Sequence, residues 1–291
     1  MIFYQKNNTT VVHGDTLDVL DQVVRDRSVP LIFADPPYNI GKRFSQSLDK
    51  WQSESEYVDW CKQWLSICLR KLTPTGSLYL MASTQSMPYF DMFLRERITI
   101  LSRIVWHYDS SGVQAKNRFG SMYEPILHCV VDEKNYTFNA DDILIEAKTG
   151  AKRGLIDYRK ENPAPYNTQK VPGNAWYYAR VRYRMPEYEE HPSQKPEALL
   201  QRIIRTSSHP GDLVLDPFAG TFTTCAVAQK LHRSSIGIEK EEEYVKIGLR
   251  RLDIQKDFGG EALLSPRRNN MRRNKEGVRV VTSTVETGRL F

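Results

Sequence analysis

Short apolar runs alternate with helical stretches along most of this chain, and few folds accommodate that order. Seven runs have the length and composition of strands, at residues 10–13, 31–34, 77–81, 100–107, 124–131, 212–215 and 235–238. The clearest helical stretches are 54–72, 196–207, 221–231 and 241–254. Such alternation is typical of a parallel sheet covered by helices on both faces. We therefore expect an α/β fold built on a doubly wound, mostly parallel sheet.

Two neighbouring runs depart from this alternation. Residues 100–107 and 124–131 leave no room between them for the crossover helix that a parallel pair of strands would need. They therefore predict an antiparallel hairpin, and with it one antiparallel edge strand in the sheet.

Composition divides the chain into four segments. Apolar periodicity fades between residues 139 and 188, where Lys, Arg, Tyr, Pro and Gly dominate, so we interpret 139–188 as an inserted, irregular segment. Residues 259–291 contain a run of basic side chains with few large apolar ones, which predicts a mobile basic tail. The segments 1–138 and 189–258 would then be two halves of one folded domain, which a chain of 291 residues can form.

Charge and hydropathy favour some classes of protein over others. The formal net charge of +6 and the pI of about 9.0 favour a polyanionic partner such as nucleic acid. No apolar run approaches the roughly 20 residues that span a bilayer. The N-terminus lacks the basic and apolar pattern of a signal peptide. We expect a cytoplasmic protein without a membrane role.

The four cysteines predict no site. Cys61, Cys68, Cys129 and Cys225 lack the spacing of zinc ligands, and no Pro-Cys dipeptide offers a nucleophile that could attack cytosine. We expect four buried thiols in a reduced protein, and no bound metal.

The strongest chemical signal is the tetrapeptide Asp35-Pro36-Pro37-Tyr38, which directly follows the apolar run 31–34. Parallel sheets bind ligands at the carboxyl ends of their strands, so this tetrapeptide would lie at the site-forming edge. Two successive prolines fix the backbone and remove two donors. The result is a rigid turn that is rich in hydrogen-bond acceptors.

Such a turn suits an aromatic amine, which is a poor nucleophile because its lone pair is delocalised into the ring. If the Asp35 carboxylate and the Pro36 carbonyl each accept one N–H, electron density stays on the nitrogen, which can attack a methyl donor. Tyr38 would stack on the base, and a base that reacts must first leave the duplex. Alone, the tetrapeptide is equally consistent with an ordinary turn at a strand end.

A second signal lies near residue 216, where the run 212–215 ends in an acidic turn followed by Gly220. Gly220 would let the backbone approach a ligand, and the following helix N-terminus would offer N–H groups to a carboxylate. Glu239 ends the next strand about 20 residues later, where a ribose-binding acid is usual. Phe222 stands where the dinucleotide fingerprint has another glycine, which disfavours a nicotinamide dehydrogenase. A glycine that only caps the strand remains the alternative.

A third motif makes the pattern specific. His191-Pro192-Ser193-Gln194-Lys195-Pro196 matches the motif His-Pro-Thr-Gln-Lys-Pro except for its serine. With the Asp35 turn before the inserted segment and Gly220 after it, the chain resembles the β-group amino DNA methyltransferases from Val11 to about Leu252. Residues 108–112 and 171–174 resemble the YhdJ-like orphan adenine methylases in particular. The resemblance implies a permuted class I S-adenosylmethionine-dependent methyltransferase fold, with 139–188 as the target-recognition segment.

The resemblance also implies roles for individual residues. The catalytic set would be Asp35, Pro36, Pro37 and Tyr38. The S-adenosylmethionine pocket would be lined by Asp15, Asp35, Ser193, Lys195, Asp216, Phe218, Ala219, Gly220, Thr221 and Glu239. Phe218 would lie near the sulfonium, Glu239 on the ribose, Asp15 by the adenine, and Ser193 and Lys195 by the amino acid end. From the residues alone, Lys195 is equally a solvated lysine and Asp15 equally an N-cap.

Basic side chains interleaved with aromatic ones in the inserted segment are interpreted as the target-recognition surface. The DNA-binding candidates are Lys148, Lys152, Arg153, Arg180, Arg182 and Arg184, together with Lys42 and Arg43. The last two belong to the polar segment 39–50, which would close over the flipped base as a mobile loop or serve only as a connection. Acidic residues within 139–188 also allow an exposed, charge-balanced face.

We therefore interpret the chain as a site-specific adenine-N6 methyltransferase that acts on a flipped adenine in double-stranded DNA. In the family, aspartate at position 35 goes mostly with adenine, serine with cytosine N4, and asparagine with RNA or protein substrates. The alternatives are a cytosine-N4 DNA methyltransferase, an enzyme for RNA or a protein amide, and a catalytically silent nucleic-acid-binding protein with the same fold. The family further suggests a homodimer and a separately acting cognate restriction endonuclease.

Overall fold

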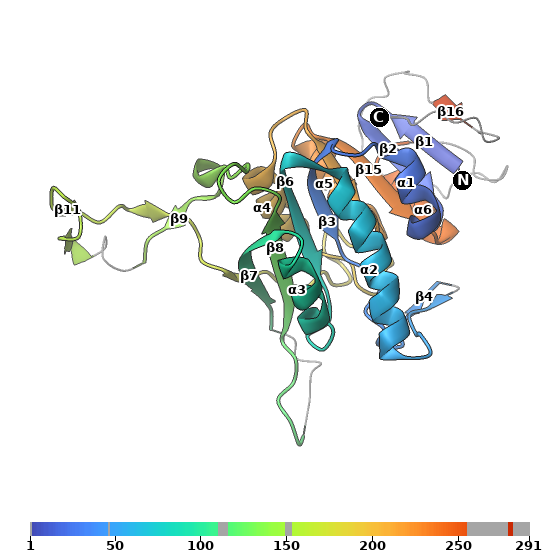
Figure 1. The fold of residues 1–291 in the computed structure, drawn as a ribbon, viewed down its shortest axis with the longest axis horizontal. Helices are drawn as coiled ribbons and strands as arrows, with labels where there is room; N and C mark the ends of the chain where they lie inside the picture. Colours follow the sequence, from blue (N-terminus) through green and yellow to red (C-terminus); the bar gives the residue numbers. More distant parts are fainter. Residues whose placement is uncertain (1, 46, 110–115, 149–152, 255–278, 282–291) are drawn as a thin grey trace.

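The computed structural model describes residues 2–45, 47–109, 116–148, 153–254 and 279–281. A ten-stranded sheet runs through the body of the molecule, with helices on both faces (Figure 1). In spatial order its strands are β13 (Ala175–Tyr177), β7 (Thr99–His107), β8 (Tyr123–Val130), β6 (Leu72–Met81), β3 (Val29–Ala34), β14 (Leu213–Asp216), β15 (Ser234–Glu239), β2 (Thr9–His13), β1 (Ile2–Lys6) and β16 (Arg279–Val281). The expected doubly wound α/β architecture is confirmed.

The central strands are parallel, and antiparallel pairs occur toward both ends of the sheet. β7 and β8 form the expected hairpin, and β8 also pairs antiparallel with β6. The antiparallel strand β8 therefore lies inside the sheet rather than at its edge as expected, because β7 lies beyond it and β13 of the inserted segment, parallel to β7, takes the edge position. At the opposite end, β1 runs antiparallel to both β2 and β16.

Helices α1 (Thr16–Val23), α2 (Glu54–Lys71) and α3 (Met87–Arg95) cover one face of the sheet. In α2, the Ser53 side chain caps the first turn by accepting the Glu56 N–H at 3.1 Å. Its buried side chains recur at helical spacing and pack on the strands: Tyr57, Val58, Cys61, Trp64, Leu65 and Cys68. The apolar periodicity of the sequence therefore directs this helix onto the sheet.

Helices α4 (Glu197–Ser207), α5 (Thr223–Lys230) and α6 (Glu242–Arg251) lie on the other face. Leu199, Leu200, Ile203 and Ile204 of α4 pack on side chains that the strands turn to this face. The core thus has two layers, one on each side of the sheet. The four helices predicted from the sequence are confirmed as α2, α4, α5 and α6.

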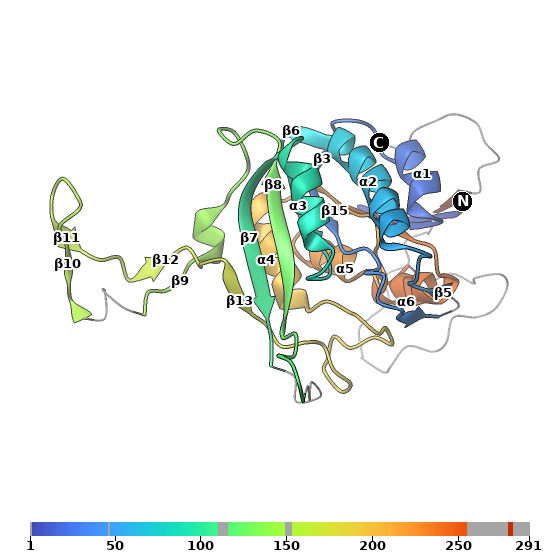
Figure 2. The same cartoon turned by 60° about the horizontal axis from the view of Figure 1, so that its bottom comes forward.

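The inserted segment leaves the body and returns to it. After a 3₁₀ helix, η1 (Ala140–Ile143), it forms an arm, described at residues 144–148 and 153–170. The arm holds two short antiparallel pairs, β9 (Ile145–Glu146) with β12 (Gln169–Lys170) and β10 (Ile156–Asp157) with β11 (Ala164–Pro165). The arm projects away from the sheet in both views (Figures 1 and 2). The chain then returns to the body at β13.

The topology brings distant parts of the chain to one edge of the sheet. β6, β3, β14, β15 and β2 run parallel, so their carboxyl ends meet there. Because β8 is antiparallel to β6, its amino end lies at the same edge. A small hairpin of β4 (Arg43–Phe44) and β5 (Ser47–Leu48) follows β3.

Three smaller expectations can be compared with the structure. The four cysteines are buried, as predicted. In the described part of the chain, no helix has the length and apolar character needed to cross a membrane. Of the predicted basic tail, only Arg279–Val281 is described, where it pairs with β1; the remainder lies outside the described residues.

Candidate active site

A cavity of about 450 Å³ opens where the carboxyl ends of β3, β14 and β15 meet. Its wall contains all of the predicted catalytic and cofactor residues: Asp15, Asp35, Pro36, Pro37, Tyr38, Ser193, Lys195, Asp216, Phe218, Ala219, Gly220, Thr221 and Glu239. The fold therefore brings the Asp35 turn and the Gly220 loop into one site.

The Asp35 turn is held from two sides at the end of β3. The Tyr57 hydroxyl, on α2, donates to the Pro37 carbonyl at 2.9 Å. The Tyr38 N–H donates to the Asp49 carboxylate at 3.2 Å, and this carboxylate also accepts the Lys42 N–H. The buried Asp49 thus anchors both the turn and the hairpin that follows it.

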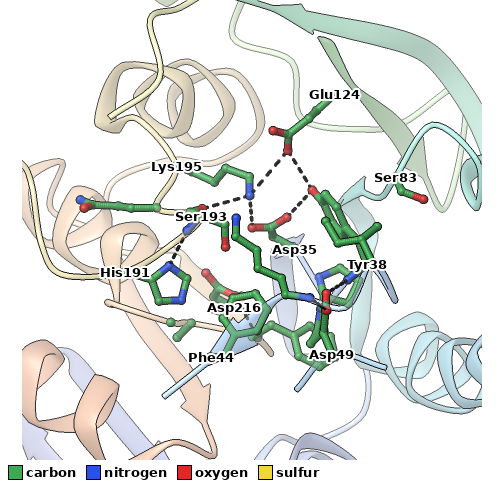
Figure 3. Close-up of a pocket in the computed structure, with 18 of the residues that line it drawn as sticks. Asp35, Tyr38, Phe44, Asp49, Ser83, Glu124, His191, Ser193, Lys195 and Asp216 are labelled. Atoms are coloured by element: carbon green, nitrogen blue, oxygen red, sulfur yellow. Dashed lines mark hydrogen bonds and ion pairs between the residues drawn. The ribbon is translucent and has the colours of Figure 1, made fainter. Parts of the chain in front are cut away.

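The side chains of Asp35 and Tyr38 in this turn converge with those of Lys195 and Glu124 (Figure 3), and Tyr108 adjoins them. The Lys195 ammonium donates to Asp35 Oδ2 at 2.5 Å and lies 3.7 Å from Glu124 Oε2. The Tyr38 hydroxyl lies 2.6 Å from Asp35 Oδ1 and 3.0 Å from Glu124 Oε2. The Tyr108 hydroxyl contacts the other oxygen of Glu124 at 3.4 Å. The cluster holds two carboxylates and one cation.

Burial governs protonation in the cluster. Loss of solvent raises the pKa of Asp35; the Lys195 charge opposes this rise and the Glu124 carboxylate adds to it. Burial lowers the pKa of Lys195, but attraction to Asp35 and Glu124 outweighs it, so that pKa is raised overall. Burial and the two carboxylates raise the pKa of Tyr38 well above its usual range. The Tyr38 hydroxyl therefore remains a donor.

The loop after β14 presents its backbone to the cavity. Gly220 has a φ of +51°, and a side chain there would meet the His191 ring at 3.3 Å. The Gly220 N–H donates to Glu239 Oε2 at 2.9 Å, and the Glu241 N–H donates to Oε1 at 2.8 Å. Burial raises the pKa of Glu239 to about 7. The predicted acid therefore stands directly beside the predicted glycine.

Asp216, the last residue of β14, stands at the start of the same loop. Its carboxylate accepts the Phe218 N–H at 3.0 Å and the Thr224 hydroxyl at 2.5 Å. Burial raises the pKa of Asp216 to about 7. One oxygen binds the loop and the other binds the first turn of α5, so Asp216 acts on the cavity by fixing the position of Phe218 relative to that helix.

Phe222 explains how the loop turns without another glycine. Its backbone is left-handed, with a φ of +59°, and its N–H donates to the Ala219 carbonyl at 2.6 Å. The fully buried ring lies where side chains at Gly237 and Gly248 would otherwise be. Burying this ring contributes about 2 kcal/mol or more, which offsets the roughly 1–2 kcal/mol cost of a left-handed residue.

Asp15 combines two of the roles considered for it. Its side chain accepts the Leu17 N–H at 3.0 Å and caps α1, as the alternative interpretation predicted. It also lines the cavity. The cap uses one carboxylate oxygen of Asp15, so a contact with a cofactor would be made by the other oxygen.

The segment 39–50 contains the β4–β5 hairpin. Lys42 Nζ donates to the Pro192 carbonyl at 2.6 Å, and the Ser45 hydroxyl donates to the Glu243 carboxylate at 2.6 Å. The hairpin thus connects the Asp35 turn to the half of the domain that carries Gly220. Its movement over a bound base remains a prediction.

The predicted DNA-binding residues fall into separate groups. Lys42 and Arg180 line the cavity. Arg182, which donates to the Asp109 carbonyl at 3.0 Å, and Arg184 follow β13 on the body. Arg43 is exposed in β4, Lys148 and Arg153 are exposed in the arm, and Lys152 lies outside the described residues.

A family model described as DNA methylase matches residues 29–250, a span that holds both the Asp35 turn and the Gly220 loop. The chain belongs to this family. The methylase is 59% identical over 254 residues to the DNA adenine methyltransferase YhdJ of Escherichia coli (strain K12), which covers 87% of this chain and 86% of the relative. It is 33% identical over 234 residues to the Type II methyltransferase M.HpaI of Haemophilus parainfluenzae, with 80% and 70% covered. The predicted relationship to the YhdJ-like methylases is confirmed.

Solved structures share the fold of the methylase. The PvuII DNA methyltransferase (cytosine-N4-specific) superposes with a TM-score of 0.64 at 20% identity, over 85% of this chain and 87% of that one. The M1.HpyAVI–SAM complex superposes with a TM-score of 0.56 at 22% identity, over 84% and 99%. At these identities the likeness concerns the fold, and it confirms the predicted methyltransferase architecture.

The cavity of the methylase has the chemistry that S-adenosylmethionine requires. The Glu239 carboxylate, oriented by two backbone N–H groups, retains lone pairs for a ribose diol. The Phe218 ring packs against Trp64 with centroids 4.8 Å apart and lines the cavity, where an aromatic face suits a sulfonium. Among the described residues, no group of three or more His, Cys, Asp or Glu side chains could hold a metal.

Glu124 and Asp49 are among the residues of the site that were missed from the sequence. Glu124, at the amino end of β8, contacts both Tyr38 and Lys195. The predicted hairpin contained the necessary signal, since an antiparallel strand brings its first residues to the edge where parallel strands end. No sequence pattern indicated Asp49, because this residue reaches the Asp35 turn only through the backbone path of the β4–β5 hairpin.

Proposed function

We propose that the methylase transfers a methyl group from S-adenosylmethionine to the exocyclic N6 of an adenine in double-stranded DNA. The observation that carries this proposal is that Asp35 and Gly220 line the same cavity. The Gly220 loop is suited to a cofactor, and the Asp35 turn is suited to an amine. One cavity can therefore hold the methyl donor and the acceptor together.

The protein's contribution to the reaction is orientation and electrostatics. When bound, S-adenosylmethionine supplies an activated methyl group on a sulfonium. The Asp35 carboxylate and the Pro36 carbonyl accept the two N–H groups of the target amine and keep electron density on its nitrogen. Tyr57 fixes the adjoining Pro37 carbonyl, so these acceptors are positioned before the substrate arrives.

The depth of the site requires the target base to leave the duplex. The Asp35 side chain is only 15% exposed, so a base that remains stacked in a duplex is out of its reach. Tyr38 provides an aromatic face beside Asp35 for the flipped base. Lys42 and Arg180 at the cavity, with Arg43, Arg182 and Arg184 nearby, bind the phosphates around the flipped nucleotide. Lys148 and Arg153 of the arm bind DNA farther from it.

Similarity to relatives and the first residue of the catalytic turn favour adenine over cytosine as the target. The adenine methyltransferase YhdJ is 59% identical to this chain, whereas the cytosine-N4 PvuII enzyme shares only the fold at 20% identity. Aspartate at the first position of the catalytic turn agrees with adenine.

Product analysis tests the proposal. The full-length protein is incubated with unmethylated duplex DNA and methyl-labelled S-adenosylmethionine, and the digested DNA is resolved into nucleosides. N6-methyladenine is expected. N4-methylcytosine would overturn the base assignment, preference for RNA in competition would overturn the DNA assignment, and cofactor binding without transfer would show a catalytically silent protein.

Three broader expectations accompany this proposal. We place the methylase in the cytoplasm, where it can reach DNA. A homodimer is proposed, and sedimentation with and without DNA tests it. Relatives named Type II methyltransferases support a separately acting cognate endonuclease; resistance of DNA modified by this methylase to one restriction specificity would identify it.

A further inference from the structure

Lys195 occupies the place that the proposed function gives to the target adenine. Its ammonium donates to Asp35 Oδ2 at 2.5 Å and lies over the Tyr38 ring, 5.5 Å from the ring centroid. A carboxylate oxygen of Asp35 and the face of Tyr38 are the two features that would hold the amine and the ring of the base. The base and this ammonium therefore compete for the same position.

The displaced ammonium cannot simply move into water. Lys195 is 6% exposed, and its pKa is raised because Asp35 and Glu124 outweigh the effect of burial. A buried cation that loses its carboxylate without gaining another is strongly disfavoured. Among the protein's own groups, its backbone neighbour, the Ser193 carbonyl at 3.2 Å, carries no full charge to replace Asp35.

Glu124 offers the second carboxylate. Its Oε2 is already 3.7 Å from the Lys195 ammonium and 3.0 Å from the Tyr38 hydroxyl. Its Oε1 is held by the Tyr108 hydroxyl at 3.4 Å. A shift of the ammonium by about 1 Å would convert this contact into a direct charge-assisted hydrogen bond.

The hydroxyl of Tyr38 supports the same exchange. It carries one proton but lies within hydrogen-bond distance of both Asp35 and Glu124. A hydroxyl can donate to only one of two acceptors at a time. When the target amine binds Asp35, the Tyr38 hydroxyl can rotate and donate to Glu124. It therefore keeps a hydrogen-bond acceptor within the cluster.

We propose that Glu124 is a positioning residue that receives the Lys195 ammonium when the target amine takes its place on Asp35. This inference rests on the proposed function and adds a residue to it. Before DNA binds, Lys195 neutralises Asp35; with the base in place, Glu124 neutralises Lys195, and Asp35 is free to bind the amine. No proton or covalent bond is transferred in this exchange.

The test compares Glu124→Gln with the wild-type full-length protein at saturating cofactor and unmethylated duplex DNA. The amide keeps the shape of the side chain and removes its charge. We expect kcat to fall about 100-fold, the scale set by an uncompensated buried cation, while the Kd for cofactor stays within a few-fold. Glu133→Gln, on the exposed turn after β8, is the matched control and should keep wild-type kcat.

A double-mutant cycle separates this exchange from a general structural effect. If Glu124 serves to receive Lys195, then Lys195→Met removes the need for it. The variant Lys195→Met/Glu124→Gln should therefore be no slower than Lys195→Met alone. Losses that multiply in the double variant would overturn the inference, as would a wild-type kcat for Glu124→Gln.

Two further measurements distinguish a folding defect, and a failure of the proposed function, from a failure of this inference. If Glu124→Gln does not fold, judged by its thermal unfolding, Glu124→Asp is used, because it keeps the charge but withdraws it from Lys195. The double-mutant cycle with Lys195→Met is then repeated with Glu124→Asp, and a wild-type kcat for Glu124→Asp would overturn the inference. A wild-type protein that makes no N6-methyladenine would overturn the proposed function itself, and this inference with it.

Discussion

Lys195 and Asp35 form a 2.5 Å ion pair although 160 residues separate them in the chain. Asp35 follows β3, and Lys195 immediately precedes Pro196 at the start of α4, so this contact joins the Asp35 turn to the segment that leads into α4. The Asp35 turn and the Gly220 loop are far apart in the chain, although β3 and β14, the strands that they follow, are neighbours in the sheet. The ion pair adds to the contacts that Lys42 and Ser45 of the β4–β5 hairpin make with the later part of the chain.

Replacing Asp35 by Asn should abolish transfer while leaving cofactor binding intact. The amide has the same shape but lacks the charge that accepts the amine and binds Lys195. We expect kcat to fall about 10³-fold, comparable to removal of a preorganised electrostatic group in other enzymes. Nucleoside analysis gives the rate and calorimetry gives the cofactor Kd. Asp59→Asn, on the exposed side of α2, is the control; transfer retained by Asp35→Asn would remove this carboxylate from the mechanism.

The pH dependence of kcat should report the protonation of Asp35. Burial raises the pKa of this carboxyl, Lys195 lowers it, and Glu124 raises it. The reaction requires the ionised form, so activity is lost as pH falls through the raised pKa, which lies above the usual range of aspartate. In Glu124→Gln, one raising influence is removed, and the acidic limb should move to lower pH. An unmoved limb in this variant would show that Glu124 does not act on Asp35.

The convergence of Asp35 and Gly220 could be predicted because it follows from topology alone. Residues that end parallel strands meet at one edge, whatever their separation in the sequence. Glu124 could have been placed at this edge from the predicted hairpin, but its contacts with Tyr38 and Lys195 depend on the register of β8 against its two neighbours. The position of Lys195 was predicted, but its partner was not, since the direction of a long side chain is set by tertiary contacts.

Elements with weak local signals were harder to predict. Helices α1 and α3 were not among those named from the sequence: α1 is short and contains β-branched residues, and α3 has Pro88 in its first turn and is rich in aromatic residues. Strand β13 has only three residues and is defined by its pairing with β7. Phe222 in a left-handed conformation is possible only because Gly237 and Gly248, far along the chain, leave space for its ring.

Acidification should stabilise the protein through Asp216. Burial raises the pKa of its carboxyl from 3.8 to about 7 in the folded state. The folded protein therefore binds this proton more tightly than the unfolded chain, so the contribution to stability is full below about pH 4 and is lost as pH rises through about 7. The slope contributed by one such group is at most about 1.4 kcal/mol per pH unit.

Denaturant unfolding without cofactor, measured from pH 4 to 8, checks this contribution. Asp216→Asn cannot titrate, so its stability should depend less steeply on pH than that of the wild type. Part of the pH dependence of stability should remain in this variant, because the pKa of Glu239 is also raised to about 7. Parallel curves for wild type and variant would contradict the assignment to Asp216.

Gly248→Ala should destabilise the protein and weaken cofactor binding. A methyl group there would overlap the buried ring of Phe222, which ends the Gly220 loop. Overpacking of this kind costs about 1–3 kcal/mol, and the displaced ring would disturb the loop. Thermal unfolding and cofactor titration measure the two effects. Gly173→Ala is the control, because no atom lies within 4 Å of its added methyl; equal stability of the two variants would refute the close contact.

Removing the charges of the arm should weaken DNA binding and reduce its dependence on salt. Lys148 and Arg153 are exposed there, and each phosphate contact releases counterions. The double variant Lys148→Ala/Arg153→Ala should lower the slope of log K against log salt by about 2 and leave the cofactor Kd unchanged. Lys62→Ala/Lys134→Ala removes two other surface cations, the partly buried Lys62 and the exposed Lys134, and is the matched control. If both double variants bind DNA with the wild-type slope, the arm is a charge-balanced surface, and recognition must be carried by Lys42, Arg180 and their neighbours on the body.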